Sequence, residues 1–431
     1  MSNTASNTVM GLKAFLAKAV TPFHAVKAIQ NRLDAAGFVA LETNTVVEPG
    51  GSYYRIANGS SIVAVRVGHN DLASEGIALA GAHTDSPTLM VKPKPEKTRQ
   101  GYAQLGVEVY GGVLLNPWFD RDLSLAGRVS YRVGNVVKSA LVNFEHPVAV
   151  IPSLAIHLDR EVNQRRSINP QTDILPILGQ NIDDWSIRAQ LQVLIEADGG
   201  RVEEVLDYEL CFYDAQQASV IGLDHSLFAA ARLDNLLSCY VGIEALLAAD
   251  GDTTALMVCN DHEEVGSLSA AGANGPLLTR VLQQLEPDPA RYRAMIGASF
   301  MISCDNAHGI HPNFADRHDD NHGPLLNAGP VIKINSNQRY ATNSLTAGYF
   351  RTIAQQCDVP VQSFVVRTDM GCGSTIGPIT AGETGIQTLD VGVPTFAMHS
   401  IRELAGCADI GYLQTVLTHY FSRYQASNVE G

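Results

Sequence analysis

The segment CNDHEEVGSLSAAGA, residues 259–273, places four ionisable side chains directly after an apolar run. The run TALMV leads into Asp261, His262, Glu263 and Glu264. Adjacent carboxylates at the end of a buried strand are costly to remove from water unless a positive charge compensates them. The pattern therefore raises the question of which cation could stabilise it.

Four other segments place ionisable residues at equivalent positions, after an apolar run or before an amphipathic helical pattern. These residues are His83, Asp85, Asp234, Asp305 and His399. Ligands of open α/β sheets bind beyond the carboxyl ends of the strands, so two histidines and five carboxylates would meet at one edge. Imidazole and carboxylate without thiolate suit two divalent metal ions.

Each residue also has an ordinary structural interpretation. The triplet at His83 could be a turn, the two glutamates a solvated surface pair, and Asp234 only the N-cap of a helix over 235–249. Asp305 and His399 could each be a hydrogen-bonded polar group at the end of a strand. Their shared position after strand ends favours the metal interpretation.

The elements that carry these residues alternate between apolar runs and helical patterns. We expect a helix over 8–37 that stops at Gly37, and another over 235–249. The expected strands are 61–68, 77–83, 254–259, 299–304, 361–367 and 393–398. This alternation predicts an α/β fold with a mostly parallel sheet sandwiched by helices.

The middle of the chain differs in pattern. A Pro- and charge-rich break at 92–102 precedes short strands such as GVEVYGGVLL and RVSYRVGNVV, with few helical patterns. We therefore expect a β-rich insertion at 95–221, and a catalytic domain formed by 1–94 and 222–431.

Composition limits the classes of partner. The 431 residues are 45% hydrophobic and carry a formal net charge of −14, which disfavours nucleic acid and anionic membranes. The seven cysteines are scattered without a C-x-x-C pair, which favours a reducing compartment. No apolar run is long enough for a membrane helix, and we expect a cytoplasmic protein.

Seven ordered motifs between about residues 80 and 405 resemble the aspartyl aminopeptidases, the M18 family of dizinc exopeptidases. The motifs are GAHTDSPTL, ARLDN, NDHEEVGS, SCDNAHGIHPN, GPVIKINSNQRYATN, MGCGSTIGPI and FAMHSIRE. The resemblance implies the zinc exopeptidase fold and hydrolysis of N-terminal Asp or Glu from peptides. It also implies two Zn²⁺ ions, with one site able to exchange for Mn²⁺ or Co²⁺.

The resemblance assigns the metal ligands residue by residue. His83 and Asp305 would complete one site, Glu264 and His399 the other, and Asp234 would bridge the two ions. Two zinc ions would nearly neutralise the carboxylates of the cluster, which answers the question raised by the first segment.

The same resemblance gives Glu263 and Asp85 supporting roles. Asp85 would receive the second ring N–H of His83, since residues two apart on a strand face the same side. Consecutive residues leave an extended backbone in opposite directions, so Glu264 could bind metal while Glu263 acts as general base on the attacking water.

Three residues are expected to contact the substrate. Lys333 matches the family position that meets the acidic side chain, although it could be an ordinary strand lysine. Gly371 lies in a small-residue segment, 367–378, that suits a pocket wall or a loop of backbone donors. His157, in the insertion, would reach the active site of a partner subunit, or would be a core or turn histidine.

The assembly implied by the resemblance is a dimer, formed through the insertion, that builds a tetrahedral dodecamer. Two other functions stay open: a dizinc aminopeptidase for neutral residues or an N-deacylase, and a non-catalytic peptide-binding or assembly protein. The segment with His308, His311, His318 and His322 is either a third metal site or a loop that frames the pocket.

Overall fold

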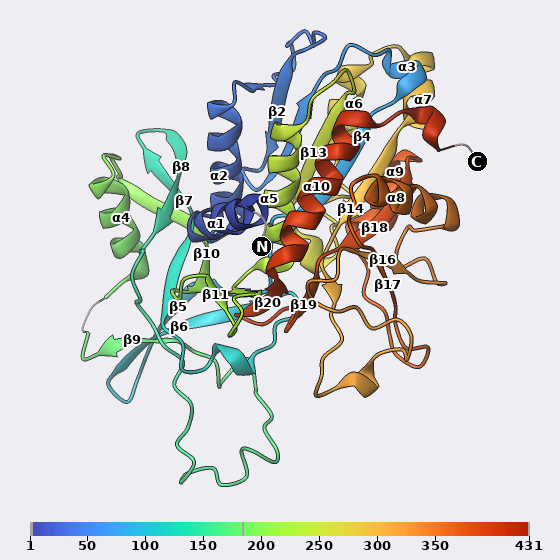
Figure 1. The fold of residues 1–431 in the computed structure, drawn as a ribbon. Helices are drawn as coiled ribbons and strands as arrows, with labels where there is room; N and C mark the ends of the chain where they lie inside the picture. Colours follow the sequence, from blue (N-terminus) through green and yellow to red (C-terminus); the bar gives the residue numbers. More distant parts are fainter. Residues whose placement is uncertain (1–2, 183–184, 430–431) are drawn as a thin grey trace. The chain divides into compact units, whose positions relative to one another are not determined.

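The computed structural model describes residues 3–182 and 185–429, and Figure 1 labels their elements. The chain divides into two compact units. The first unit contains Met1–Asp85, Ala218–Met398 and Glu403–Gly431, and the second contains Ser86–Gln217 and His399–Arg402.

A nine-stranded sheet forms the centre of the first unit, in the order β1-β2-β3-β13-β4-β14-β18-β16-β17. The strands are β1 (Val39–Ala40), β2 (Ser52–Ala57), β3 (Ser61–Arg66), β13 (Ala255–Asn260), β4 (Ala78–His83), β14 (Phe300–Cys304), β18 (Gln387–Gly392), β16 (Val331–Ile334) and β17 (Gln362–Val365). The four central strands β13, β4, β14 and β18 are parallel, whereas β3 and β16 run antiparallel to them. The expected α/β fold with a mostly parallel sheet is confirmed.

Alternate residues of the central strands enter two different cores, as the two-residue period of a strand requires. Ala80, Met257 and Ile302 belong to one core, and Leu79 and Val258 belong to the other. The first core contains α1 (Asn3–Lys18), α2 (Pro22–Ala35), α5 (Leu233–Ala248), α8 (Ser344–Gln356) and α10 (Cys407–Arg423). The second contains α6 (Leu277–Leu285), α7 (Pro289–Ala298) and α9 (Ile376–Thr384). Helices therefore cover both faces of the sheet (Figure 1).

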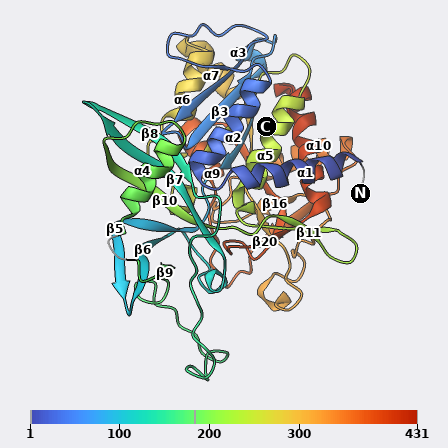
Figure 2. The same cartoon turned by 90° about the vertical axis from the view of Figure 1, so that its left-hand side faces the viewer.

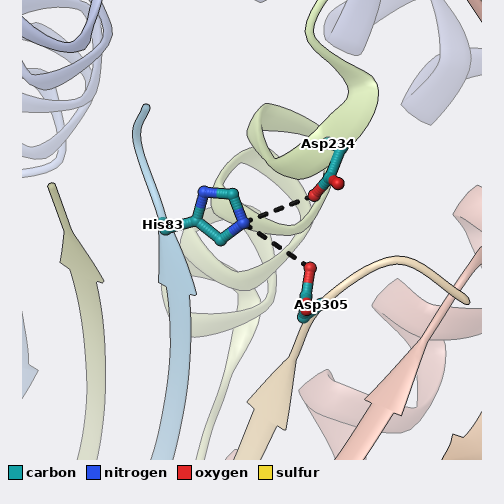
Figure 3. A group of neighbouring side chains, drawn as sticks. All are labelled: His83, Asp234 and Asp305. Carbon is teal, nitrogen blue, oxygen red and sulfur yellow. Dashed lines mark ion pairs between the residues drawn. The ribbon is translucent and has the colours of Figure 1, made fainter. Parts of the chain in front are cut away.

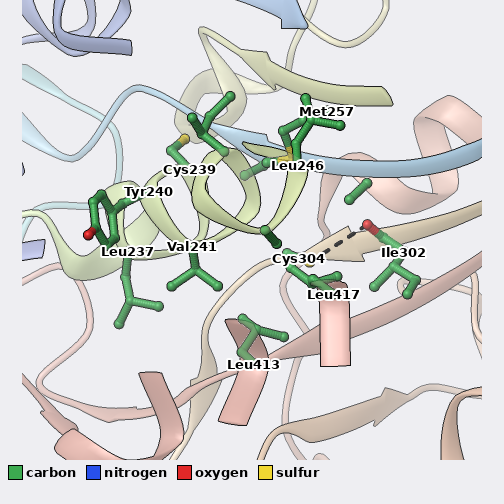
Figure 4. Packing of buried hydrophobic residues seen from close by; sticks show 14 of the residues in the cluster. Leu237, Cys239, Tyr240, Val241, Leu246, Met257, Ile302, Cys304, Leu413 and Leu417 are labelled. Atoms are coloured by element: carbon green, nitrogen blue, oxygen red, sulfur yellow. Dashed lines mark hydrogen bonds between the residues drawn. The ribbon is translucent and has the colours of Figure 1, made fainter. Parts of the chain in front are cut away.

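Helix α5 is buried between the sheet and α10. Figure 4 shows Leu237 and Val241 on the side of α10, near Leu413, while Cys239 and Met257 lie on the other side of the helix. Full burial of a Leu or Val side chain contributes roughly 1.5–3 kcal/mol, so this packing fixes the helix start that carries Asp234.

A smaller sheet and a tethered loop complete the first unit. The sheet joins β11 (Ser219–Ile221), β12 (Leu227–Ala230), β20 (Glu403–Gly406), β19 (Pro394–Phe396) and β15 (Ala307–His308).

In the first turn of α10, the buried Asp409 carboxylate accepts the backbone N–H groups of Asn327 and Gly329 at 2.5 and 2.8 Å. Burial raises the pKa of Asp409 to about 7, although these bonds oppose the shift. They fix the loop that leads into β16.

The second unit is an antiparallel sheet with its own apolar core. Its strands are β8 (Val136–Asn143), β7 (Leu123–Val133), β10 (Glu204–Asp214), β5 (Thr88–Arg99), β6 (Tyr102–Tyr110) and β9 (Ile177–Gln180), in that order. Helix α4 (Ile187–Ala197) lies beside β8 and β10 (Figures 1 and 2). Its buried side chains Ile187, Leu191 and Ile195 join the core of this unit.

Several sequence predictions were wrong in detail. The helix expected over 8–37 is two helices, because Thr21 caps α2 and Pro22 occupies its first turn. The expected break at 92–102 lies largely in β5, whose pairing with β6 is irregular between Val91 and Glu96, around Pro93 and Pro95.

Two expected strands also differ. The segment RVSYRVGNVV is not one strand, because Gly134 turns it from β7 into β8. The last expected strand, 393–398, contains β19, which belongs to the small sheet and not to the main sheet. The sequence analysis did not predict β18, the fourth parallel strand of the main sheet. Among the residues that the structure describes, no helix is long and apolar enough to cross a membrane.

Candidate metal centre

The ends of three parallel strands bring three of the predicted ligands, His83, Glu264 and Asp305, to one edge of the main sheet. His83 is the last residue of β4 and pairs in register with Asn260, the last residue of β13. On the other side of β4, β14 ends at Cys304, so Asp305 follows it directly. Parallel pairing thus aligns the strand ends, as the sequence predicted.

The ring of His83 lies at the centre of a carboxylate cluster. Its Nε2 atom is 3.3 Å from Asp234 Oδ1 and 3.5 Å from Asp305 Oδ1. The dashed lines in Figure 3 mark these two ion pairs. Glu263 Oε2 is 3.8 Å from the same nitrogen. The His83, Asp234 and Asp305 ligand atoms lie within 4.8 Å of one another, as do those of His83, Glu263 and Glu264.

Asp234 reaches the cluster through an irregular helix start. The alternative interpretation of Asp234 as the N-cap was wrong, because Arg232 precedes the helix in the left-handed region, and Asp234 and Asn235 have non-helical backbone angles. The N–H of Asp234 donates to Glu403 Oε2 at 2.9 Å, and Asn235 Nδ2 donates to the Cys304 carbonyl at 2.7 Å. These bonds join the start of α5 to β20 and β14.

The side chain of Asp85 connects two motifs of the site. Its Oδ1 accepts the backbone N–H of Glu263 at 3.2 Å, and its Oδ2 accepts that of Glu264 at 3.1 Å. His83 Nδ1 lies 3.0 Å from the Asp85 carbonyl oxygen and 3.4 Å from Oδ1. Asp85 is only 1% exposed, so both contacts are shielded from water. A ring nitrogen so engaged leaves Nε2 to face the cluster.

The two adjacent glutamates lie in a short 3₁₀ helix, Glu263–Val265, and not in extended backbone. The expectation that their side chains alternate across a strand was therefore wrong. The backbone of His262 lies in the left-handed region, so the chain leaves the direction of β13 just before the 3₁₀ helix begins. Successive side chains of a 3₁₀ helix point about a third of a turn apart, which still gives the two carboxylates different directions.

The buried carboxylates change the acid–base properties of the centre. Burial raises the pKa of Glu263 to about 7, with Asp305, Asp234 and Asp85 adding to the shift and His83 opposing it. Burial alone would lower the pKa of His83, but the facing carboxylates raise it well above its usual value.

This centre fits a divalent metal by the chemistry of its donors. One imidazole nitrogen and several carboxylate oxygens converge in a buried space, and these are ligands that zinc accepts. A metal would displace the proton that the carboxylates hold on His83.

Two of the predicted site residues belong to the second unit. His399 falls within the second unit, where its Nδ1 lies 3.0 Å from the Gly112 carbonyl oxygen. His157 is exposed in the second unit. Their expected roles at the metal centre and at a partner's active site stay predictions.

Lys333 and Gly371 lie in the first unit, in different surroundings. Lys333 is only 3% exposed, and its ammonium contacts Asp305. Gly371 lines a pocket of about 270 Å³ whose wall includes His308, His311 and Phe364. The substrate contacts expected of both residues stay predictions.

Sequence reasoning missed one part of the site and left a second with two interpretations, a third metal site or a loop that frames the pocket. Glu403, which holds the Asp234 backbone, lies in the recognised FAMHSIRE segment but was given no role. The histidine-rich segment contributes His308, His311 and His318 to the pocket, and none of them belongs to a candidate metal group among the described residues. Burial lowers the pKa of His308 to about 4, so its ring is neutral near pH 7.

Comparison with known proteins identifies the family. The model of the aminopeptidase I zinc metalloproteases, M18, matches residues 15–421. The chain belongs to the M18 family. It is 58% identical over 416 residues to a probable M18 family aminopeptidase 2 of Pseudomonas putida, covering 95% of this chain and 97% of that protein.

Solved structures agree with this assignment. A chain of the Ape4 and Nbr1 complex superposes with a TM-score of 0.93 at 36% identity, covering 97% of this chain and 86% of that one. The S. cerevisiae mApe1 dodecamer gives 0.86 at 28% identity, covering 99% and 98%. This M18 chain is therefore a zinc metallo-aminopeptidase, a class of enzyme that needs a metal centre for catalysis.

The contacts of Asp85 generate the first prediction. In Asp85→Asn, one oxygen becomes an amide nitrogen and can no longer accept an N–H from the glutamate turn. We expect zinc affinity or turnover to fall about 10- to 100-fold, the usual cost of losing a group that orients a metal ligand. Zinc competition with a chelator and peptide hydrolysis would measure these effects.

Asp261→Asn is the matched control for this variant. Asp261 is buried at the same strand end, but its carboxylate contacts the His262 backbone and ring instead of a predicted ligand. Equal effects of the two substitutions would contradict a specific role for Asp85.

Proposed function

We propose that this M18 enzyme removes N-terminal Asp and Glu residues from peptides at a centre that holds two zinc ions. The observation that carries the proposal is the convergence of Asp234, Asp305 and Glu263 on Nε2 of His83. In addition to this cluster, the proposed second site uses Glu264 and His399, with Asp234 bridging the two ions. One site would accept Mn²⁺ or Co²⁺ in place of zinc.

Glu263 is the proposed general base. When bound, zinc lowers the pKa of water to about 7 and polarises the scissile carbonyl. Glu263 accepts a proton from the attacking water and donates it to the leaving amine. Asp85 keeps the glutamate turn and His83 in place during these steps.

The pocket lined by Gly371 is the proposed site for the substrate's N-terminal side chain. Its wall includes His308, which follows the predicted ligand Asp305 by three residues in the chain. Arg367 and Arg317 also line it, although Arg367 pairs with Asp369 at 2.7 Å. These guanidinium groups support a preference for acidic side chains, since arginine recognises carboxylates through paired hydrogen bonds.

A panel of dipeptides with Asp, Glu, Leu or N-acetylated first residues would test the preference. We expect kcat/KM for Asp and Glu to exceed that for Leu by about 10-fold or more, because one charge-assisted contact contributes roughly 1.5–3 kcal/mol. N-acetylated substrates should not react. A faster reaction with Leu would favour the neutral aminopeptidase alternative, and no hydrolysis of any peptide would favour a binding protein.

The role of Glu263 yields a second test. Glu263→Gln keeps the shape of the side chain but cannot accept a proton, so we expect kcat to fall by about 10²- to 10⁴-fold with zinc content unchanged. Metal analysis and single-turnover hydrolysis would be measured on the same preparation. Glu264→Gln is the control, and should lose zinc. A metal-replete Glu263→Gln enzyme with normal turnover would rule out the base assignment.

We also propose that the insertion predicted at 95–221, most of which belongs to the second unit, dimerises the chain. In the dimer, His157 would lie at the partner's active site. The apolar side chains beside it are exposed, Leu154 by 60% and Leu158 by 74%, which is unusual unless another surface covers them. The related mApe1 is described as a dodecamer, and dimers of this chain would assemble in the same way.

Mixing two inactive variants, Glu263→Gln and His157→Ala, tests this arrangement. If His157 acts on the partner, subunit exchange creates sites with an intact Glu263 and an intact neighbouring His157. We expect partial return of peptide hydrolysis, with exchange verified by native mass spectrometry. Verified exchange without recovery would mean that His157 acts within its own subunit.

The proposed compartment is the cytoplasm. All seven cysteines are free of disulfides in the structure, and five of them are buried. This pattern suits a reducing environment.

A further inference from the structure

The ammonium group of Lys333 is buried and completely used. Lys333 lies in β16 with 3% of its surface exposed. A buried ammonium needs a partner for each of its three donors. Here Nζ donates to the Asp305 carbonyl at 3.1 Å, to Asp305 Oδ2 at 3.0 Å and to the Asn306 carbonyl at 3.0 Å.

We propose that Lys333 is a positioning residue, which fixes the Asp305 carboxylate so that a single oxygen, Oδ1, serves as the metal ligand. The two oxygens of Asp305 have different partners. Oδ1 lies 3.5 Å from His83 Nε2, whereas Oδ2 is held by Lys333. Because Lys333 also binds the Asp305 and Asn306 carbonyls, it fixes the backbone as well as the carboxylate. This inference rests on the proposed metal centre.

Tyr340 and Asp390 also stabilise the Lys333 ammonium. It lies 5.0 Å from the centre of the Tyr340 ring, within the range of a cation–π contact. The fully buried Asp390, in β18, also acts electrostatically on Lys333. Thr375 Oγ1 and the Ala341 N–H, each at 2.6 Å, hold the Asp390 carboxylate. A cation held so firmly can fix the direction of a metal ligand.

This geometry leaves Lys333 no free donor for a substrate. A substrate carboxylate could bind the ammonium only by displacing Asp305 or one of the two backbone carbonyls. The positioning role and the substrate contact expected from the family resemblance therefore predict different results. Loss of a substrate contact would affect acidic peptides selectively. Loss of positioning would weaken the metal site and lower hydrolysis of every peptide.

The test uses Lys333→Met, which keeps the length of the side chain and removes its donors. Metal-stripped full-length protein is titrated with Co²⁺, and binding and coordination are followed by visible absorption. We expect about 10- to 100-fold weaker cobalt binding and an altered spectrum. In cobalt-saturated enzyme, kcat/KM should fall by a similar factor for Asp, Glu and Leu peptides. Lys333→Gln, which retains donors, should show a smaller loss and provides the same test if Lys333→Met does not fold.

A double-mutant cycle with Asp305→Ala separates positioning from general damage. If Lys333 acts through Asp305, adding Lys333→Met to Asp305→Ala should weaken cobalt binding no further. Thr388→Val is the matched control, because Thr388 is buried in the same strand as Asp390 but its hydroxyl donates to the Ile386 carbonyl instead of to Asp390 or Asp305. It should retain the wild-type spectrum.

Two results would overturn the inference, and they are distinguishable. Wild-type cobalt affinity and spectrum in Lys333→Met, with a loss confined to Asp and Glu peptides, would make Lys333 a substrate contact and leave the metal centre intact. Equal cobalt binding by Asp305→Ala and the wild type would overturn the proposed metal site, and the role of Lys333 with it.

Discussion

Electrostatic repulsion among buried carboxylates is the constraint on which the site depends. The charges of Asp85, Asp234, Glu263 and Asp305 all act on His83, which is itself 1% exposed. Like charges this close are strongly unfavourable where little water screens them. Without a metal, the cluster retains protons on His83 and raises the pKa of Glu263. A divalent cation removes this repulsion, so metal binding and stability of the site are coupled.

The rest of the first unit keeps these groups together despite their repulsion. Each of three carboxylate-bearing segments is held by a contact that does not occupy the oxygen facing His83. The glutamate turn binds Asp85, the Asp234 backbone binds Glu403, and Lys333 binds the far oxygen of Asp305. The apolar packing of α5 against the sheet supplies the rigid support. A centre prepared in this way loses little entropy when it captures metal, which is how supporting contacts increase affinity.

The sequence predicted the positions of the strand ends better than their surroundings. His83 and Asp305 could be found because each follows an apolar run that stops, and parallel pairing then aligns the ends. The irregular start of α5 could not be found, because the bond from Asp234 to Glu403 joins residues 169 positions apart. The burial of Lys333 depends likewise on the packing of β16 and the loop after β14, which no local pattern encodes.

The central claim is that the carboxylate cluster exists to hold metal for peptide hydrolysis. The most direct measurement is elemental analysis of chelator-treated and zinc-reconstituted protein, with hydrolysis of an Asp peptide assayed on the same samples. The account predicts that reconstituted wild type holds two zinc ions per chain and regains activity, whereas Asp234→Ala regains neither. Full activity in metal-free protein, or normal zinc content in Asp234→Ala, would contradict it.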